Sequence, residues 1–292
     1  MNKIVIPFVL LLFFILSCSK TELQVKDVGI NGNVPPPDHT IDSSEISIYI
    51  NKAYINLTGR EPSPAEKSDA LSVLRQHNFS TDDRRQFVNT LFAKDEYLSN
   101  LYNVANNEFL RSLDSSEIEL TIFQLNYLLS QPQNAPFYGY LHFELYRIDT
   151  LKTVMDLMRA SSMDYRGMLS RMTNNYFYDQ INMGSENFVV STYQNFLFRY
   201  PSNAELLAGK TMVDGNTSTV FLKTGKSKYD YIHIFFDTDD YYEGQVRFIF
   251  KKYLFREPLS AEIYLYSAIY KNSNDYRELQ RAVYTSDEYA GI

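Results

Sequence analysis

Tryptophan is missing from the sequence, and cysteine occurs once and histidine four times in 292 residues. With a single cysteine, Cys18, the chain has no internal disulfide, and we expect no catalytic thiol in its folded part. The histidines are far apart and lack the H-E-x-x-H or other ligand spacing, so we expect no metal site and no cofactor. They are His39, His77, His142 and His233. The 24 tyrosines and 20 phenylalanines must therefore fill the core.

Long runs of basic residues are missing too. The formal net charge is −7 and no run of five Lys or Arg occurs, so we expect no nucleic-acid partner. No G-x-S-x-G motif is present, and residues 208–211 only resemble the end of a phosphate-binding loop, because Ala204 stands where the loop needs glycine. We therefore expect that the protein is not an enzyme. A Ser/His/Asp triad assembled from distant positions stays open, and so does calcium binding by Asp237, Asp239, Asp240 and Glu243.

The N-terminus carries an apolar run, Ile4–Leu16, of thirteen residues. This is shorter than the roughly 18–20 residues that a membrane-spanning helix needs. Residues 15–18, Ile-Leu-Ser-Cys, resemble the lipobox of bacterial lipoproteins. The resemblance implies a signal peptide at 1–17, fatty acylation (palmitate or a related chain) of Cys18, and, because Ser19 follows, an outer-membrane address in a diderm bacterium. The sequence does not decide which side of that membrane the protein faces. Two alternatives to the lipoprotein signal also stay open, an ordinary secretory signal and an uncleaved membrane anchor.

After the expected cleavage site, the amino-acid composition distinguishes a tether from a folded part. Residues 18–41 contain several glycines and prolines and no periodic apolar face, so we expect a lipidated cysteine followed by a flexible tether. The folded part begins near Ile41. We expect one helical domain at 42–185 and a second at 186–292.

The apolar residues of the folded part recur with a helical period. They fall at i, i+3, i+4, i+7, i+8 and i+11 in Ile46, Tyr49, Ile50, Ala53, Tyr54 and Leu57. A stripe in the same register precedes three similar phrases, REPSPAE at 60–66, RYPSNAE at 199–205 and REPLSAE at 256–262. The sequence thus predicts an all-α fold of helical-hairpin repeats, packed as an irregular array.

Each phrase has the chemistry of a corner between two helices. Proline ends the first helix, and in the first copy Ser63 and Glu66 form a capping box for the second, with Pro64 at its first position. In the third copy Leu259 stands where the capping serine is expected, so the box there is incomplete. We expect the arginines to cap carbonyls or to pair with an acid of a neighbouring unit. The corner residues are Arg60, Pro62, Glu66, Arg199, Pro201, Glu205, Arg256, Pro258 and Glu262.

The three units also end alike, with an acidic residue before Tyr97, Tyr241 and Tyr289. Residues 164–166, Asp-Tyr-Arg, are similar to residues 275–277, so a degenerate fourth unit stays open. Leu57–Glu66, followed by an acidic pair and Tyr97, resembles the cytochrome-c-associated domain of unknown function described from planctomycetes. Arg256–Tyr289 is similar to short secreted repeat domains of unknown function. These resemblances imply no catalytic residues, and without a Cys-x-x-Cys-His motif they imply no haem.

Aromatic residues at 137–140 and 176–178 lie in or beside segments without a clean helical stripe. Core packing is one interpretation, and a protein-binding surface with Tyr138 and Tyr178 at its centre is the other. We expect a lipid-anchored helical scaffold or accessory subunit of an outer-membrane protein complex, which acts by binding. The alternative is a glycan-binding or glycan-active cell-surface lipoprotein. A cleft that is lined by aromatic residues and holds two carboxylates would support this alternative.

Overall fold

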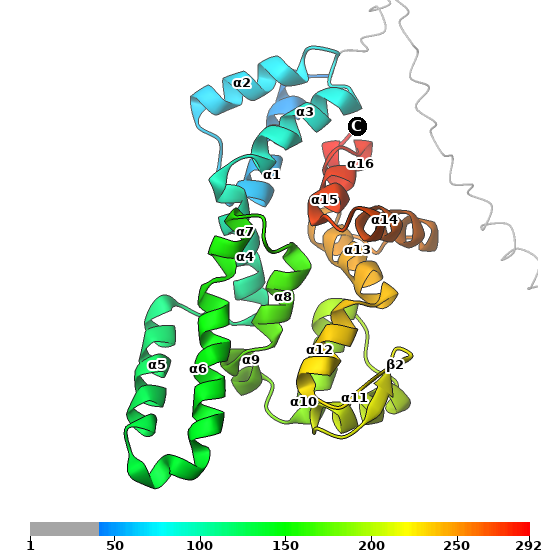
Figure 1. Ribbon diagram of the computed structural model, residues 1–292. Helices are drawn as coiled ribbons and strands as arrows, with labels where there is room; N and C mark the ends of the chain where they lie inside the picture. The colour runs from blue at the N-terminus through cyan, green and yellow to red at the C-terminus, as the bar shows by residue number, and fades with distance from the viewer. Residues whose placement is uncertain (1–40) are drawn as a thin grey trace, which may run out of the picture. The chain divides into compact units, whose positions relative to one another are not determined.

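The computed structural model describes residues 41–292, and the expected signal peptide, Cys18 and the expected tether up to residue 40 lie outside the described residues. The regular secondary structure of the described part is almost entirely helical, which confirms the all-α prediction (Figure 1). Residues Thr40–Ile292 form one compact unit, so the boundary expected at 185/186 lies within that unit.

The first four helices surround the first corner. Their bounds are α1 Ser43–Thr58, α2 Pro64–Leu74, α3 Thr81–Phe92 and α4 Asp95–Phe109. Asp42 caps α1 by accepting a hydrogen bond from the Ser44 backbone, and Gly59 ends the helix with a φ of 75°. The apolar stripe of α1 is buried as its period predicts.

The next helices include a long hairpin, in which α5 and α6 run side by side (Figure 1). The bounds are α5 Ser115–Leu129, the 3₁₀ turn η1 Pro132–Phe137, α6 Tyr138–Lys152, α7 Val154–Arg159, α8 Tyr165–Thr173 and α9 Tyr176–Ile181. Ile118, Thr121 and Leu125 form the buried face of α5. Its packing partners are mainly α6 and η1, whereas α6 also packs against α7, α8 and α9.

The C-terminal part contains the other two corners. The bounds are α10 Ser185–Thr192, the π-helical turn η2 Tyr193–Leu197, α11 Asn203–Val213, α12 Lys228–Phe236, α13 Asp239–Tyr253, α14 Ser260–Ser273, α15 Tyr276–Tyr284 and α16 Asp287–Ala290. Two short strands, β1 Ser218–Val220 and β2 Lys223–Gly225, pair antiparallel. Phe221 and Leu222 connect them with φ values of 47° and 63°, as in the two-residue turns of β-hairpins.

The first and last helices of the described part pack together. The Tyr49 hydroxyl donates to the Tyr284 carbonyl oxygen at 3.1 Å. Arg84, which is buried, donates to a carboxylate oxygen of Asp287 at 2.5 Å. These contacts join α1 and α3 to α15 and α16, so the first and third corners belong to one packed body.

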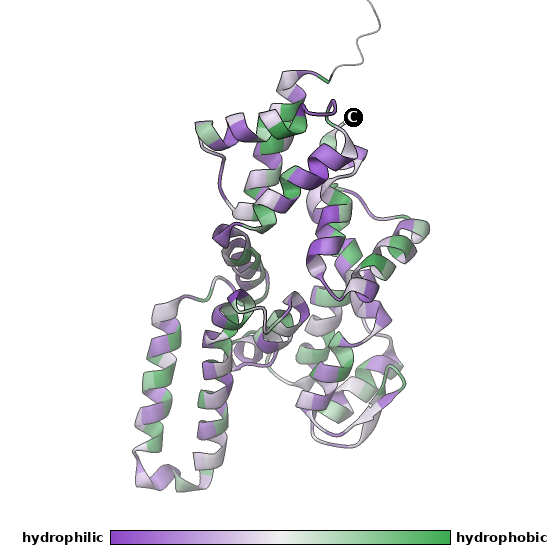
Figure 2. Cartoon of the chain, turned by 45° about the horizontal axis from the view of Figure 1, so that its top comes forward, coloured by the Kyte–Doolittle hydropathy of each residue, from purple (hydrophilic) through white to green (hydrophobic). Residues whose placement is uncertain are grey.

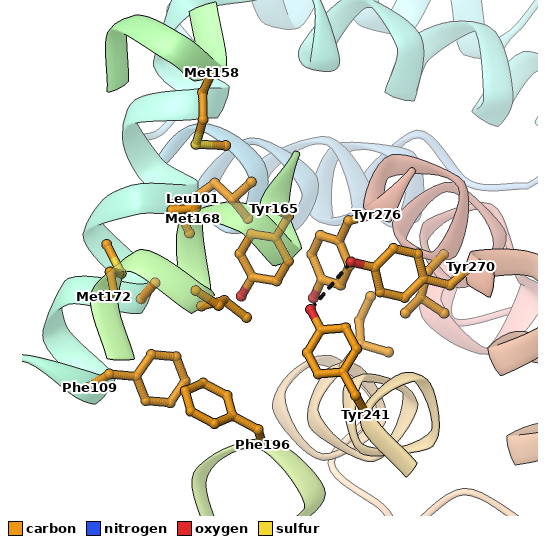
Figure 3. Packing of buried hydrophobic residues seen from close by; sticks show 14 of the residues in the cluster. Leu101, Phe109, Met158, Tyr165, Met168, Met172, Phe196, Tyr241, Tyr270 and Tyr276 are labelled. Carbon is orange, nitrogen blue, oxygen red and sulfur yellow. Dashed lines mark hydrogen bonds between the residues drawn. The ribbon is translucent and has the colours of Figure 1, made fainter. Parts of the chain in front are cut away.

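Tyrosine forms much of the core between α8, α13, α14 and α15 (Figure 3). The rings of Tyr165 and Tyr276 are stacked, with their centroids 4.2 Å apart. The hydroxyls of Tyr241 and Tyr270 lie 3.4 Å apart. All four side chains are buried, so the tyrosines do fill space in place of tryptophan.

Candidate functional site

The three corners share one pattern of hydrogen bonds. At the first, the Arg60 guanidinium donates from Nη1 and Nη2 to the two carboxylate oxygens of Glu66, both at 2.8 Å. Nη1 also donates to the Glu61 carbonyl oxygen at 3.0 Å. The same two-pronged pairing occurs between Arg199 and Glu205 and between Arg256 and Glu262.

A second acid completes each corner. Arg60 pairs with Glu96 at 3.0 Å, and Glu96 belongs to the acidic pair at the start of α4. Asp240 at the start of α13 and Glu288 at the start of α16 occupy the equivalent place for Arg199 and Arg256. The guanidinium donors are thus engaged by carbonyl and carboxylate oxygens, but both acids belong to the arginine's own unit, and not to a neighbouring unit as predicted from the sequence.

The residue six positions before each arginine is aromatic and lies beneath the guanidinium. Arg199 stands 4.9 Å from the ring centroid of Tyr193, and Arg256 stands 5.0 Å from that of Phe250. The residue just before the arginine adopts a left-handed conformation, which Gly59 tolerates at little cost and Phe198, with a φ of 56°, does not. The corners are therefore alike in geometry, while common origin of the three units as repeats stays a prediction.

Hydrogen bonding at the corners lowers the carboxyl pKa values. Arg199 and the Ser202 backbone lower the pKa of Glu205 to about 2, although partial burial acts in the opposite direction. Glu66 is shifted in the same direction, first by Arg60 and then by Lys94. These carboxylates stay ionised and paired, so they fix the corners and are unsuited to proton transfer.

A cleft of about 660 Å³ lies between α4, α8 and α15. Tyr97, Tyr165 and Tyr276 line it, together with the carboxylates of Asp164 and Asp275. The volume is within the range of small-molecule sites. No motif in the sequence pointed directly to this cleft, but the two similar Asp-Tyr-Arg segments meet here.

The two aspartates of the cleft are helix caps. Asp164 accepts from the Gly167 backbone N–H at 2.7 Å, and Asp275 accepts from that of Arg277 at 2.9 Å. The side chain of Asn274 links the two segments by donating to Asp164 at 3.3 Å. Burial alone would raise the pKa of Asp275, but hydrogen bonds from Arg277 outweigh burial and lower it. Asp275 is therefore ionised at neutral pH and cannot act there as a general acid.

The α5–α6 hairpin exposes an unusual set of large apolar side chains, which we call the hairpin surface. Its residues are between 40% and 69% exposed, and they are Leu120, Phe123, Tyr127, Leu128, Phe137, Tyr140, Phe143 and Tyr146. The 24 residues from 120 to 143 contain no Asp, Glu, Lys or Arg. Figure 2 shows hydrophobic residues along both helices of the hairpin. Tyr138 is half-buried beside this surface and donates to the Gln131 carbonyl oxygen at 3.2 Å.

Tyr178 does not belong to any exposed surface, so the prediction that it binds a partner there is wrong. Residues 176–181 form α9 and not a loop, because Asn175 caps this helix with hydrogen bonds to the Phe177 and Tyr178 backbones. The Tyr178 side chain is fully buried, packs edge-on against Phe188, and accepts a hydrogen bond from Asn195 at 3.0 Å. Tyr178 is a core residue.

A buried group of charges, which sequence reasoning missed, lies where the hairpin joins the rest of the fold. Arg147 donates to both oxygens of Glu144, at 2.9 and 3.0 Å, and to Asp179 at 2.7 Å. Lys228 also pairs with Asp179. Burial raises the pKa of Glu144, while Arg147 opposes this shift. The i, i+3 pair on a mostly apolar helix was the only sequence sign of this group.

The other sequence candidates do not converge. Three carboxylates of the suggested calcium site pair with separate cations, which are Lys223 for Asp237, Lys271 for Asp239 and Arg199 for Asp240. Among residues 41–292 no group of three His, Cys, Asp or Glu is placed to hold a metal ion. Residues 208–211 lie within the helix α11. No helix in this described range has both the length and the apolar character to cross a membrane.

Comparisons with known proteins found no match: no protein-family model, no curated protein and no solved structure is similar to the chain. The resemblances to bacterial lipoproteins and to the planctomycete domain stay predictions.

Proposed function

We propose that this protein is a lipid-anchored helical scaffold, or an accessory subunit of an outer-membrane protein complex, and that it acts by binding. The hairpin surface is the observation that supports this proposal. Its eight side chains each leave roughly 100 Å² in contact with water, given that an aromatic side chain buries about 150–250 Å². Summed over both helices of the hairpin, this is roughly 800 Å² of exposed apolar side chain, which is about the area that one partner buries in a standard interface.

The composition of this surface favours a protein partner. Protein interfaces are enriched in aromatic residues at their centre and depleted of charge there. The segment from 120 to 143 combines tyrosine, phenylalanine and leucine with uncharged Asn, Gln and Ser. A nucleic acid would instead require clustered Lys and Arg.

The test is a native pull-down of the full chain in mild detergent. Phe123→Asp places a charge at a position that is 69% exposed, so it should release protein partners while the melting temperature is retained. Tyr264→Asp, on α14, is the matched control, because Tyr264 is 80% exposed and lies outside the hairpin. Partners retained by Phe123→Asp to the same extent as by the control would contradict this role of the hairpin surface.

The lipid anchor has a separate test. Cys18→Ala should release the chain from membrane fractions or leave its precursor unprocessed, because the acylated residue would be lost. Unchanged membrane pelleting of a correctly processed Cys18→Ala chain would remove the anchor from the proposal without affecting the binding surface.

A glycan-binding or glycan-active lipoprotein is a second candidate, and the cleft is the observation that favours it. Its lining includes three tyrosines, whose side chains are almost fully buried, and two aspartates. Because Asp275 is held ionised and both aspartates cap helices, the cleft supports binding better than hydrolysis, for which one carboxyl must be protonated. Turnover of bacterial-surface polysaccharides by the purified chain, abolished by Asp164→Asn, would favour this candidate over the scaffold.

A further inference from the structure

Both sides of α5 are apolar. Ile118, Thr121 and Leu125 form the buried face, whereas Leu120, Phe123 and Tyr127 are exposed. With 3.6 residues per turn, the exposed residues project from the opposite side of the helix. An apolar side of a helix is normally covered by packing, but α6 and η1 provide most of the packing of α5 within the chain, on its other side.

We propose that a second copy of this chain covers the hairpin surface, so that two α5–α6 hairpins pack into a four-helix arrangement. This inference rests on the proposed binding function and names the partner at the hairpin surface. A two-helix hairpin can bury only one seam, and pairing two hairpins is a common way of covering the remaining apolar faces. A two-fold axis would place the same residues on both sides of the interface.

Charge opposes a second copy least at the hairpin surface. The chain carries a formal net charge of −7, so two copies repel each other over most of their surface. The 24 uncharged residues of the hairpin are where this repulsion is weakest. The two charges that flank this segment are both paired, Glu119 with Lys152 at 2.7 Å and Glu144 with Arg147 at 2.9 Å.

The area is of the right order. Summed over all exposed sides of its two helices, the hairpin of each copy offers roughly 800 Å² of apolar side chain, and a standard stable interface takes about 800 Å² from each partner. A lipid surface fits less well. The turn between the helices, which would enter the bilayer first, carries Gln131, Gln133 and Asn134, and no Lys or Arg is present to meet anionic lipid.

The experiment measures the mass of the full chain, purified in mild detergent, by sedimentation with correction for bound detergent. We expect a dimer for the wild-type chain and for the control Tyr264→Asp. For Phe123→Asp we expect a monomer and a dissociation constant raised more than about a hundredfold, because a charge would be buried at the centre of the interface. If Phe123→Asp lowers the melting temperature, Leu120→Lys on the same exposed face takes its place and should have the same effect.

The inference is overturned if the wild-type chain is monomeric up to about 50 µM, which is far above the dissociation constant expected of an interface of this size. It is overturned equally if the hairpin variants stay dimeric. The two proposals fail separately. If the chain is monomeric but Phe123→Asp releases a different protein, the dimer is refuted and the accessory function stands. If the chain is a dimer but captures no other protein, the accessory function is refuted and the dimer stands.

Discussion

Replacing Gly244 by alanine is expected to destabilise the protein strongly, because α13 approaches the π-helical turn η2 most closely at this residue. A Cβ atom at Gly244 would lie 1.9 Å from the carbonyl oxygen of Phe196 and 2.9 Å from Cα of Leu197. Real Cβ atoms essentially never approach a neighbour closer than 3.0 Å. Because both neighbouring atoms belong to the backbone, no side chain can rotate away to make room.

The size of the effect follows from this geometry. The two elements must separate by roughly 1 Å, which loosens the close packing along the rest of their contact. Overpacking of this kind lowers the free energy of unfolding by about 1–3 kcal/mol and occasionally more. The better helix propensity of alanine offsets about 1 kcal/mol of this loss. Since here the clash is with backbone, we expect a cost above that range, about 4 kcal/mol, and hence a net loss of about 3 kcal/mol in the free energy of unfolding. For a domain of this size that lowers the melting temperature by roughly 6–12 °C.

The assay is thermal and urea unfolding followed by circular dichroism, with Gly139→Ala as the control. Gly139 lies in α6, and a Cβ added there would have nothing within 4 Å. That variant should gain roughly 0.5–1 kcal/mol from helix propensity alone. If Gly244→Ala melted within about 2 °C of the wild-type protein, less than 1 kcal/mol would have been lost, and the close approach of α13 to η2 would be refuted.

Three further predictions concern the charged groups. Glu66→Ala should cost about 1–2 kcal/mol in urea unfolding, because it removes half of a capping box and a partner of Arg60; an unchanged midpoint would contradict this. Arg147→Met should cost about 3–5 kcal/mol at pH 7, since it leaves Glu144 buried without its partner, and the loss should shrink at pH 4; a loss independent of pH would argue against an unpaired carboxylate as its cause. The pKa of Glu205 is lowered to about 2, so its contribution to stability is complete above its ordinary value of 4.5 and disappears as the pH falls towards 2. Allowing for solvent screening, this contribution is about 1 kcal/mol, and Glu205→Gln should flatten the acid limb of the stability curve by that amount; parallel curves for the two proteins would disprove it.

The corners were predictable from the sequence because their determinants are local. Proline, a capping serine and a glutamate three residues later act within seven residues of chain, and the structure places Ser63 and Glu66 in the expected capping box. Leu259 lacks an acceptor atom, and only the reverse half of the box forms there, with the Leu259 backbone donating to Glu262 at 2.6 Å. The second acid of each corner, such as Glu96, lies on the next helix but one, and only its position before a tyrosine hinted at it.

The cleft was not predictable, and of the hairpin surface only the aromatic residues at 137–140 were proposed from the sequence, because both features depend on which helices meet. Tyr97 and Tyr276 lie in the same cleft although most of the chain separates them. Tyr178 was misjudged because a short helix capped by Asn175 turns its ring inwards, and three-residue strands such as β1 and β2 carry too little pattern to be seen. At the hairpin, the helical period of the apolar residues indicated one buried face of α5, but it could not show that the opposite face would stay uncovered.

The buried tyrosines are expected to make the folded protein unstable at high pH. Burial raises the pKa of Tyr165, Tyr241 and Tyr276 well above the ordinary value of 10.0. In the unfolded chain the same hydroxyls ionise near pH 10, so the free energy of unfolding falls by about 1.4 kcal/mol per pH unit for each buried tyrosine above that point. Several such groups acting together make the loss steep. Because the chain has no tryptophan to obscure the signal, the ultraviolet absorbance of tyrosinate would report this alkaline unfolding directly.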